Sequence, residues 1–226
     1  MSNNNSEKPV IAILGGTGKE GSGLALRWAY VGFPVIIGSR QLEKAQTAAS
    51  ELNKVLGKEI VSGMENTKAA ENASICVLTV VQEAHQAALQ SLKPSLQGKI
   101  LVDATARVDF RDPKPPSPPS AARIAQNLLG KQVKVVAAFQ NIPAHSLRKK
   151  LGQTLDCDVL LCSDDTQAAQ IIIDLAKLAG MRALYAGGLD NAITVEGLTA
   201  LLISINKHYG IKNASLFISG LEGQKQ

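Results

Sequence analysis

The sequence has few aromatic residues, few cysteines and no long apolar run. Aromatic residues make up 4% of the 226 positions, and three residues are cysteine. Cys76, Cys157 and Cys162 show no CxxC spacing, and each lies in an apolar run. We therefore expect buried, reduced thiols, with neither a disulfide nor a metal site. No apolar stretch reaches the roughly eighteen residues of a membrane-spanning helix, so we expect no membrane partner.

Concentrated charge is also missing. The net charge is +5, but the 24 lysines and arginines are scattered, and no basic helix carries interleaved aromatic residues. This pattern argues against nucleic acid as a partner, and an anionic cofactor accounts for a mild excess of positive charge. The first eight residues are polar and lack the apolar segment of a secretory signal, so we expect a cytoplasmic protein.

Short apolar runs alternate with helix-length amphipathic segments through the first 140 residues. The runs are nearly continuous in Val, Ile, Leu and Ala, which is typical of strands buried on both faces of a parallel sheet. The expected strands are Pro9 to Leu14, Pro34 to Gly38, Ala73 to Val80, Lys99 to Ala104 and Val133 to Phe139. The expected helices are Lys19 to Val31, Gln41 to Leu56, Gln82 to Leu92 and Ser120 to Leu129. The alternation predicts an α/β fold, a Rossmann-like doubly wound parallel sheet.

The pattern changes after Pro143, where a smaller C-terminal α/β part is expected. It consists of strands at Asp158 to Cys162 and Arg182 to Ala186 and helices at Asp165 to Ala179 and Ala192 to His208. We therefore divide the chain into an NADP-binding domain, residues 9–142, and a subdomain for acceptor binding and dimerisation, residues 143–220. The last helix is apolar on more than one face, which favours a homodimer.

A proline-rich segment interrupts the alternation at residues 112–119. Its prolines cannot donate a ladder of backbone hydrogen bonds, so we expect an extended surface loop. The loop follows the strand that ends near Asp103, on the side where open α/β sheets bind ligands. Both a lid over the ligand and a plain connection are consistent with this position.

The strongest functional motif is a glycine turn between the first strand and the first helix. It follows the pattern GxGxxG with Gly16, Gly18 and Gly21, and Gly15 precedes it. Glycines in these places allow a sharp turn and a close approach of the backbone to a pyrophosphate, which the free N–H groups of the helix N-terminus then bind. The context of strand, turn and helix predicts a dinucleotide site.

The end of the second strand indicates which dinucleotide. An NAD-binding protein places an Asp or Glu here for the ribose 2′-hydroxyl, and this chain has Ser39 and Arg40 instead, with Lys44 one helical turn further. A hydroxyl, a guanidinium fork and an ammonium group suit a 2′-phosphate. NADP is therefore the expected cofactor.

Several motifs together resemble a known family. They are Gly15-Gly-Thr-Gly18, Gly38-Ser-Arg40, Gly63-Met64, Val77-Leu-Thr79 and Asn141-Ile-Pro-Ala144. The sequence from Val10 to about Leu202 is similar to the NADPH-dependent coenzyme F420 reductases, and also to the oxidoreductase domain of the six-transmembrane metalloreductases. The resemblance implies a homodimeric cytoplasmic enzyme that transfers a hydride between NADPH and a deazaflavin or flavin ring.

The resemblance also implies a set of cofactor-binding residues. Beside Gly15 and Gly16 in the glycine turn, it assigns Thr17, Gly18, Lys19 and Glu20 to the pyrophosphate and Ser39, Arg40 and Lys44 to the 2′-phosphate. It assigns Thr79, Val80, Ala106, Asn141, Ile142 and Ala144 to the nicotinamide side, with the acceptor ring between residues 141–144 and 191–199. The chain departs from the family pattern at Val81-Gln-Glu-Ala84, at Phe139-Gln-Asn-Ile-Pro143 and at Ile193, where an arginine is expected. Because these positions lie near the acceptor, a plain flavin is the second candidate acceptor.

No residue is assigned as a catalytic acid or base. A hydride acceptor that is itself a ring cofactor mainly needs two rings held together with water excluded. His85, His145 and His208 are each more simply explained as ordinary histidines, although His145 directly follows Pro143-Ala144.

Three alternatives remain at this point. One is an NADP-binding redox sensor without turnover. Another is a short-chain carbonyl reductase, which needs a Tyr and Lys pair; only Tyr209 is closely followed by a lysine, Lys212, beyond the last expected helix. The third is an imino or hydroxy acid dehydrogenase, for which the residues after Pro143 are too few unless a dimer supplies the rest.

Overall fold

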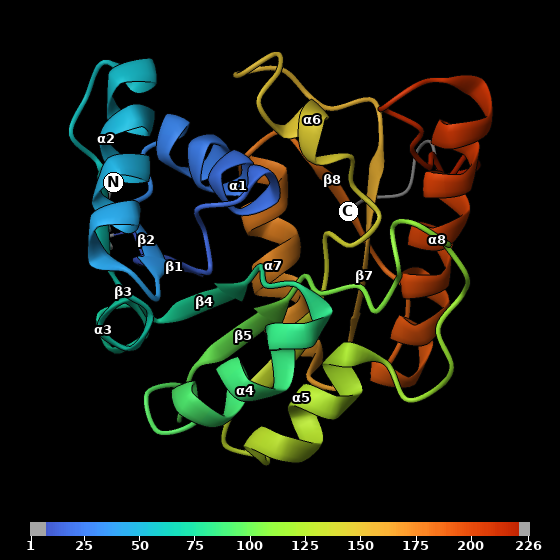
Figure 1. Cartoon of the computed structure of the whole chain (residues 1–226), viewed down its shortest axis with the longest axis horizontal. Helices are drawn as coiled ribbons and strands as arrows, with labels where there is room; N and C mark the ends of the chain where they lie inside the picture. The colour runs from blue at the N-terminus through green and yellow to red at the C-terminus, as the bar shows by residue number, and fades with distance from the viewer. Residues whose placement is uncertain (1–7, 222–226) are drawn as a thin grey trace, which may run out of the picture.

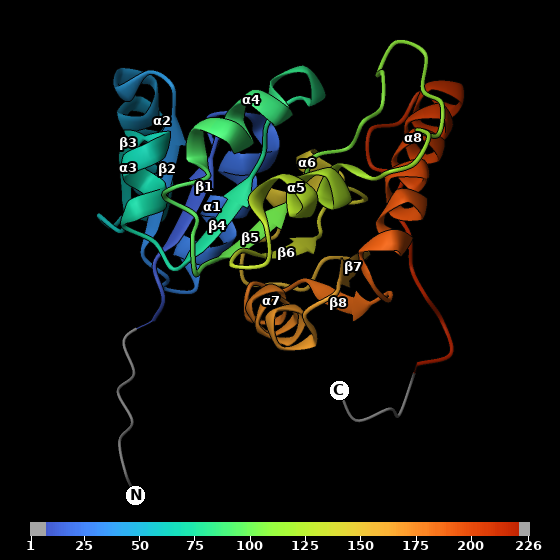
Figure 2. The same cartoon turned by 90° about the horizontal axis from the view of Figure 1, so that it is seen from below.

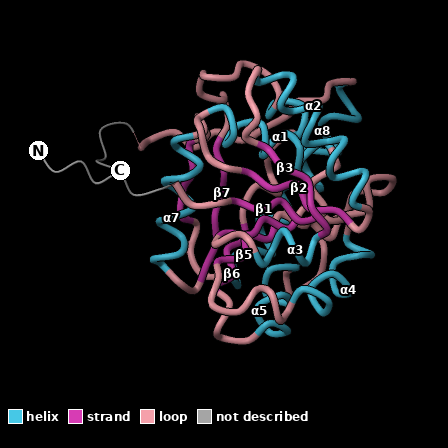
Figure 3. The backbone as a smooth tube through the Cα atoms, turned by 90° about the vertical axis from the view of Figure 1, so that its left-hand side faces the viewer, coloured by secondary structure: helices cyan, strands magenta, loops and turns pink. Residues whose placement is uncertain are grey.

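A computed structural model describes residues 8–221, and all structural statements concern this part of the chain. Eight strands form one sheet in the order β3-β2-β1-β4-β5-β6-β7-β8, with helices on both faces (Figures 1 and 3). The strands are β1 (Ile11–Leu14), β2 (Val35–Ser39), β3 (Val61–Glu65), β4 (Ile75–Leu78), β5 (Ile100–Asp103), β6 (Lys134–Ala137), β7 (Asp158–Ser163) and β8 (Arg182–Tyr185). The helices are α1 (Lys19–Tyr30), α2 (Leu42–Leu56), α3 (Asn66–Glu71), α4 (Gln82–Leu92), α5 (Ala121–Leu129), α6 (Ala144–Leu147), α7 (Thr166–Leu178) and α8 (Ala192–Tyr209), with a short 3-10 turn at Leu189–Asn191.

The central strands of the sheet are buried on both faces, as their continuous apolar residues predicted. In β1, Ile11 and Ile13 belong to a core shared with α1, α2 and α7, whereas Ala12 and Leu14 belong to a second core shared with α3, α4 and α5. Successive strand residues point to opposite faces, so one apolar strand supplies both cores. Cys76, Cys157 and Cys162 are buried free thiols, and burial raises their pKa values to about 12, 11 and 11.

The pairing directions confirm the Rossmann-like fold and add two features. All neighbours from β3 to β6 are parallel, but β6 and β7 are antiparallel, with Val136 opposite Ser163. The edge strand β3 and the short helix α3 were not predicted from the sequence. The sheet continues across residue 142 through the β6 and β7 pair, and the division into two domains remains a prediction.

Helix α8 lies to one side of the sheet, beside the proline-rich loop (Figures 1 and 2). The loop is mostly exposed, as predicted, and is anchored to α8 at two places. Lys207 Nζ donates to the carbonyl of Arg111 (2.9 Å), and the buried Glu196 carboxylate accepts a hydrogen bond from the amide of Ala121. These two contacts hold both ends of the loop against α8.

Candidate functional site

The first and third glycines of the turn are required by packing. The amide of Gly16 donates to the carbonyl of Gly38 at the end of β2 (2.9 Å), and a Cβ on Gly16 would lie 2.6 Å from the carbonyl oxygen of Ile13. A Cβ on Gly21 would lie 2.6 Å from Oγ1 of Thr79, which follows β4. These contacts match the sharp turn and the close packing of helix on strand that a GxGxxG loop provides.

The second glycine has open space around it. A Cβ built on Gly18 meets no atom within 4 Å, and Gly18 has φ −77° and ψ 173°, an extended conformation open to any residue. Packing therefore does not require a glycine here. Gly18 is the N-cap of α1, and the amide of Ser22 donates to its carbonyl (2.9 Å), so the preceding amides at the helix start are available to an anion. The open cradle fits the pyrophosphate of a dinucleotide.

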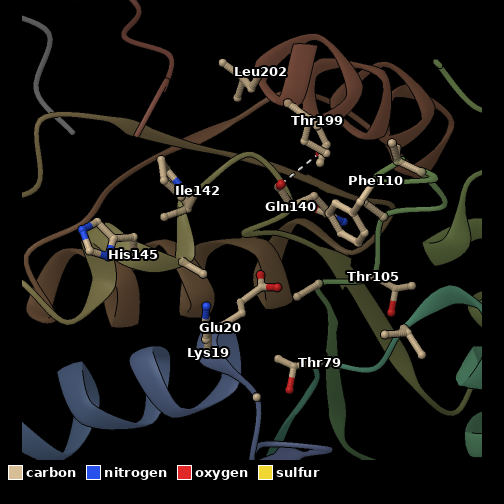
Figure 4. A pocket seen from close by; sticks show the side chains of 18 of the residues that line it. Lys19, Glu20, Thr79, Thr105, Phe110, Gln140, Ile142, His145, Thr199 and Leu202 are labelled. Carbon is tan, nitrogen blue, oxygen red and sulfur yellow. Dashed lines mark hydrogen bonds between the residues drawn. The ribbon is translucent and has the colours of Figure 1, made fainter. Parts of the chain in front are cut away.

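A cavity of about 1110 Å³ extends from this cradle across the carboxyl ends of the parallel strands to α8 (Figure 4). It is larger than the roughly 300–1000 Å³ of ordinary small-molecule sites, so it has room for part of a dinucleotide and a second ring. Ten of the residues named from the sequence line it: Thr17, Gly18, Lys19, Glu20, Thr79, Val80, Ala106, Asn141, Ile142 and Ala144. Thr199, Leu202 and Ile203 of α8 close the far side.

The other residues named from the sequence lie outside this cavity. Gly15 and Gly16 lie in the turn itself, where Gly15 has φ +74° and a Cβ would lie 2.7 Å from Val80. Ser39 is buried and accepts a hydrogen bond from the amide of Gln41 (3.2 Å), while Arg40 and Lys44 are exposed. The bond from Gly16 to Gly38 places these residues beside the glycine turn, at the position expected for the ribose of the dinucleotide.

Sequence analysis did not identify three side chains that shape the site. Oδ1 of Asn66 accepts a hydrogen bond from the amide of Gly15 (3.0 Å) and so fixes the glycine turn from α3. Arg148 lines the cavity and donates to Oγ of Ser22 (3.0 Å). Arg27 is buried in α1 and donates to the carbonyls of Leu147 and Lys149 (2.9 and 2.8 Å), which holds the segment after β6 against α1. These contacts join residues 51 to 126 positions apart, and nothing local in the sequence indicates them.

The histidines differ in their surroundings. His85 Nε2 lies 2.7 Å from Oδ2 of Asp103 in a buried pair, and His85 does not line the cavity. His145 lines the cavity, and His208 is exposed near the end of α8, with its ring against Tyr209. Within residues 8–221, no group of three His, Cys, Asp or Glu side chains is placed to hold a metal ion, and no helix is both long and apolar enough to cross a membrane.

The cavity wall contains polar atoms without a partner in the protein. Oε1 of Glu20, Oγ1 of Thr105 and Oε1 of Gln140 are buried and form no hydrogen bond within the described residues. The amide nitrogen of Gln140 donates to the carbonyl of Asp103 (2.9 Å), which fixes the orientation of its side chain. Buried polar atoms are normally paired, so these three favour a polar ligand in the cavity.

Glu20 is the titratable group most affected by its surroundings. Burial alone raises the pKa of its carboxyl from 4.5 to about 8, so the side chain is mostly neutral at pH 7. In the unfolded chain the same carboxyl ionises above pH 4.5. The free energy of unfolding should therefore decrease as the pH rises from about 4.5 to about 8 and stay lower above that.

This linkage predicts the stability of a Glu20→Gln variant, whose amide cannot ionise. Its melting temperature should be close to that of the wild type near pH 4.5 and roughly 4–16 °C higher at pH 8.5, for a gain of roughly 2–4 kcal/mol. Calorimetry at both pH values measures this difference. The Glu83→Gln variant, which changes an exposed carboxylate of the same cavity, should show no such gain. Equal behaviour of the two variants would contradict the raised pKa of Glu20.

Comparison with known proteins agrees with this geometry. The model of a family described as NADP oxidoreductase, coenzyme F420-dependent, matches residues 10–107. The F420-dependent NADP reductase of Methanothermobacter thermautotrophicus is 39% identical over 95% of this chain and 97% of its own length. The crystal structure of an F420-dependent NADP reductase candidate from Arthrobacter sp. FB24 superposes with a TM-score of 0.75 at 26% identity, covering 92% of this chain and 98% of that chain.

A more distant similarity confirms the second resemblance. Metalloreductase STEAP3 of Rattus norvegicus is 29% identical over 87% of this chain, which spans 38% of that protein. The higher identity of the Methanothermobacter reductase, and its match over nearly the whole length of both chains, assign the chain more narrowly. The chain is an NADP-dependent oxidoreductase with a Rossmann-like fold and belongs to the family of the F420-dependent NADP reductases.

Proposed function

We propose that the protein transfers a hydride between NADPH and the deazaflavin ring of coenzyme F420. The observation that carries this proposal is the single cavity that runs from the anion cradle at Gly18 to the apolar side chains of α8. The hydride passes between the nicotinamide ring and the deazaflavin ring. The protein has to hold two rings in contact and keep water out, which requires shape more than acid or base groups.

The residues around the far half of the cavity suit a flat ring. Ile142 on the loop after β6 and Leu202 on α8 provide apolar surfaces, and Phe110 lines the cavity from the loop after β5 (Figure 4). Oγ1 of Thr199 donates to the carbonyl of Gln140 (2.9 Å), which ties α8 to this loop. We infer that residues 143–220 form the part that binds the acceptor and that residues 9–142 hold NADP, with Phe110 and Ile142 of this first part also facing the acceptor ring.

The proposal includes a preference for coenzyme F420 over FMN and FAD, with a plain flavin as second acceptor. Ile193 stands where the family pattern has an arginine, in the first turn of α8, and it does not line the cavity. Arginine at this position should improve use of an anionic acceptor through charge. Steady-state rates with coenzyme F420, FMN and FAD should therefore show a several-fold rise in kcat/KM for coenzyme F420 alone in the Ile193→Arg variant. An equal rise for all three acceptors would mean that the arginine does not distinguish the anionic tail of coenzyme F420 from the phosphate groups of FMN and FAD.

We also propose that α8 forms the interface of a homodimer. Leu201 is 52% exposed, and Ile193, Leu198, Ile203 and Ile205 on the same helix are only partly buried. An apolar helix that remains this open on a single chain is typical of a surface covered by a second copy.

The dimer is tested with one charged substitution at its proposed centre. Light scattering at micromolar concentration should give twice the 23.8 kDa mass of one chain for the wild type and a single-chain mass for Leu201→Glu. Val55→Glu is the matched control, since Val55 is 65% exposed on α2, and this variant should remain dimeric. A monomeric wild type would refute the interface.

A further inference from the structure

Glu20 places a carboxyl group at the cavity where one of its oxygens is buried and has no partner among residues 8–221. It lies in the first turn of α1, directly after the cradle at Gly18, and its side chain is directed into the cavity (Figure 4). Its Oε1 is buried and has no hydrogen-bond partner within the described residues. A buried carboxyl oxygen without a partner is costly, and a ligand that enters the cavity can supply one.

The charge state of Glu20 decides what it can bind. A carboxylate near a helix N-terminus is stabilised by the helix dipole, an effect worth less than about one pKa unit. Burial outweighs the dipole here, because it raises the pKa of Glu20 to about 8. At neutral pH the group is therefore a carboxylic acid, which can donate one hydrogen bond as well as accept others.

The other charged groups around the cavity do not neutralise Glu20. They are Lys19 on α1, Glu83 on α4, Asp109 and Arg111 after β5, His145, Arg148 and Lys149 at α6, and Lys212 after α8. None forms a salt bridge with Glu20 among residues 8–221, and Arg148 donates a hydrogen bond to Ser22. If Glu20 were ionised, no salt-bridged cation within these residues would offset its negative charge when an anionic ligand binds beside it.

We propose that Glu20 binds the dinucleotide as a neutral acid, donating its O–H to a pyrophosphate oxygen, so that cofactor binding is linked to one proton. An ionised Glu20 in the same place would repel the pyrophosphate and lack the donor hydrogen. This inference rests on the proposed binding of NADP at Gly18 and deepens it, because it makes the affinity depend on pH.

The direction of the pH dependence follows from the pKa. Below about pH 8 Glu20 already carries the proton, so NADP affinity is constant; above it, binding must take up a proton, and affinity should fall about tenfold per pH unit. Between pH 7 and pH 9.5 the expected loss is about 30-fold. The second ionisation of the 2′-phosphate, near pH 6, is complete over this range and adds nothing.

Calorimetric titration of the full chain with NADP⁺ at pH 7, 8, 9 and 9.5, in two buffers of different ionisation enthalpy, measures both affinity and proton uptake. The wild type should lose about 30-fold in affinity and take up close to one proton at pH 9.5. The Glu20→Gln variant should show a flat profile and no proton uptake, whatever its affinity at pH 7. The Glu83→Gln variant should repeat the wild-type profile, since it leaves every other lining group in place.

The outcomes separate this inference from the proposed function. A wild type that does not bind NADP⁺ at pH 7 would refute the cofactor site itself. Binding with the same pH profile in wild type and Glu20→Gln, or proton release on binding, would overturn the role of Glu20 alone. If Glu20→Gln fails to fold, Glu20→Leu serves instead, because it also removes the titration and must also give a flat profile.

Discussion

Replacing Gly18 with aspartate should lower NADPH affinity by more than about 100-fold and leave the free protein folded. Gly18 has an extended backbone conformation, and a Cβ there meets nothing within 4 Å, so the free chain accommodates the side chain. Aspartate is among the best N-cap residues, so α1 should be no less stable. The new carboxylate would occupy the cradle that we assign to the pyrophosphate and would repel it. Fluorescence titration with NADPH and thermal melting of the same sample measure both effects.

Gly16→Ala is the matched comparison, with the opposite expected result. Its Cβ would lie 2.6 Å from the carbonyl oxygen of Ile13 and 2.9 Å from the Ile13 Cβ, so the backbone of the turn has to move. This variant should lose stability by about 1–3 kcal/mol before its binding is considered. NADPH binding by Gly18→Asp at wild-type affinity would show that the cofactor does not use this turn.

The second large effect concerns the choice of dinucleotide. Arg40→Ala should weaken NADPH binding by about 1.5–3 kcal/mol, which is roughly 10- to 150-fold, and leave NADH binding nearly unchanged. Arg40 is exposed and forms no salt bridge within residues 8–221, so its removal should not disturb the fold.

Competitive titration with the two cofactors gives the comparison directly. Lys54→Ala removes another exposed cation, at the far end of α2, and should affect neither cofactor. Equal losses for NADPH and NADH in Arg40→Ala would mean that Arg40 does not contact the 2′-phosphate.

The parallel core of the fold was predictable because burial on both faces leaves continuous apolar runs in the sequence. β3 was missed for the opposite reason: it lies at the sheet edge, and of its five residues only Val61 is buried. α3 has six residues, too few for a helical periodicity. The antiparallel pairing of β6 and β7 could not be predicted either, because an apolar run does not indicate whether a strand pairs parallel or antiparallel with its neighbour.

The candidate site likewise has residues that a local sequence motif predicts and residues that only the folded chain reveals. The glycine turn has a local pattern, and the structure gives Gly16, Gly18 and Gly21 the separate surroundings that this pattern requires. Asn66 and Arg148 act through long-range contacts, which a single sequence does not show. The burial of Glu20 likewise depends on segments that meet only in the folded chain, so its raised pKa had no signal in the sequence.

Hydride transfer between NADPH and coenzyme F420 is measured by following the nicotinamide absorbance of NADPH mixed with the purified protein and coenzyme F420. We expect hydride transfer to oxidise one NADPH for each deazaflavin reduced, faster than with FMN or FAD, and we expect no turnover by Gly18→Asp. Tight NADPH binding without oxidation by any ring acceptor would contradict it and favour a redox sensor that binds NADP without turnover.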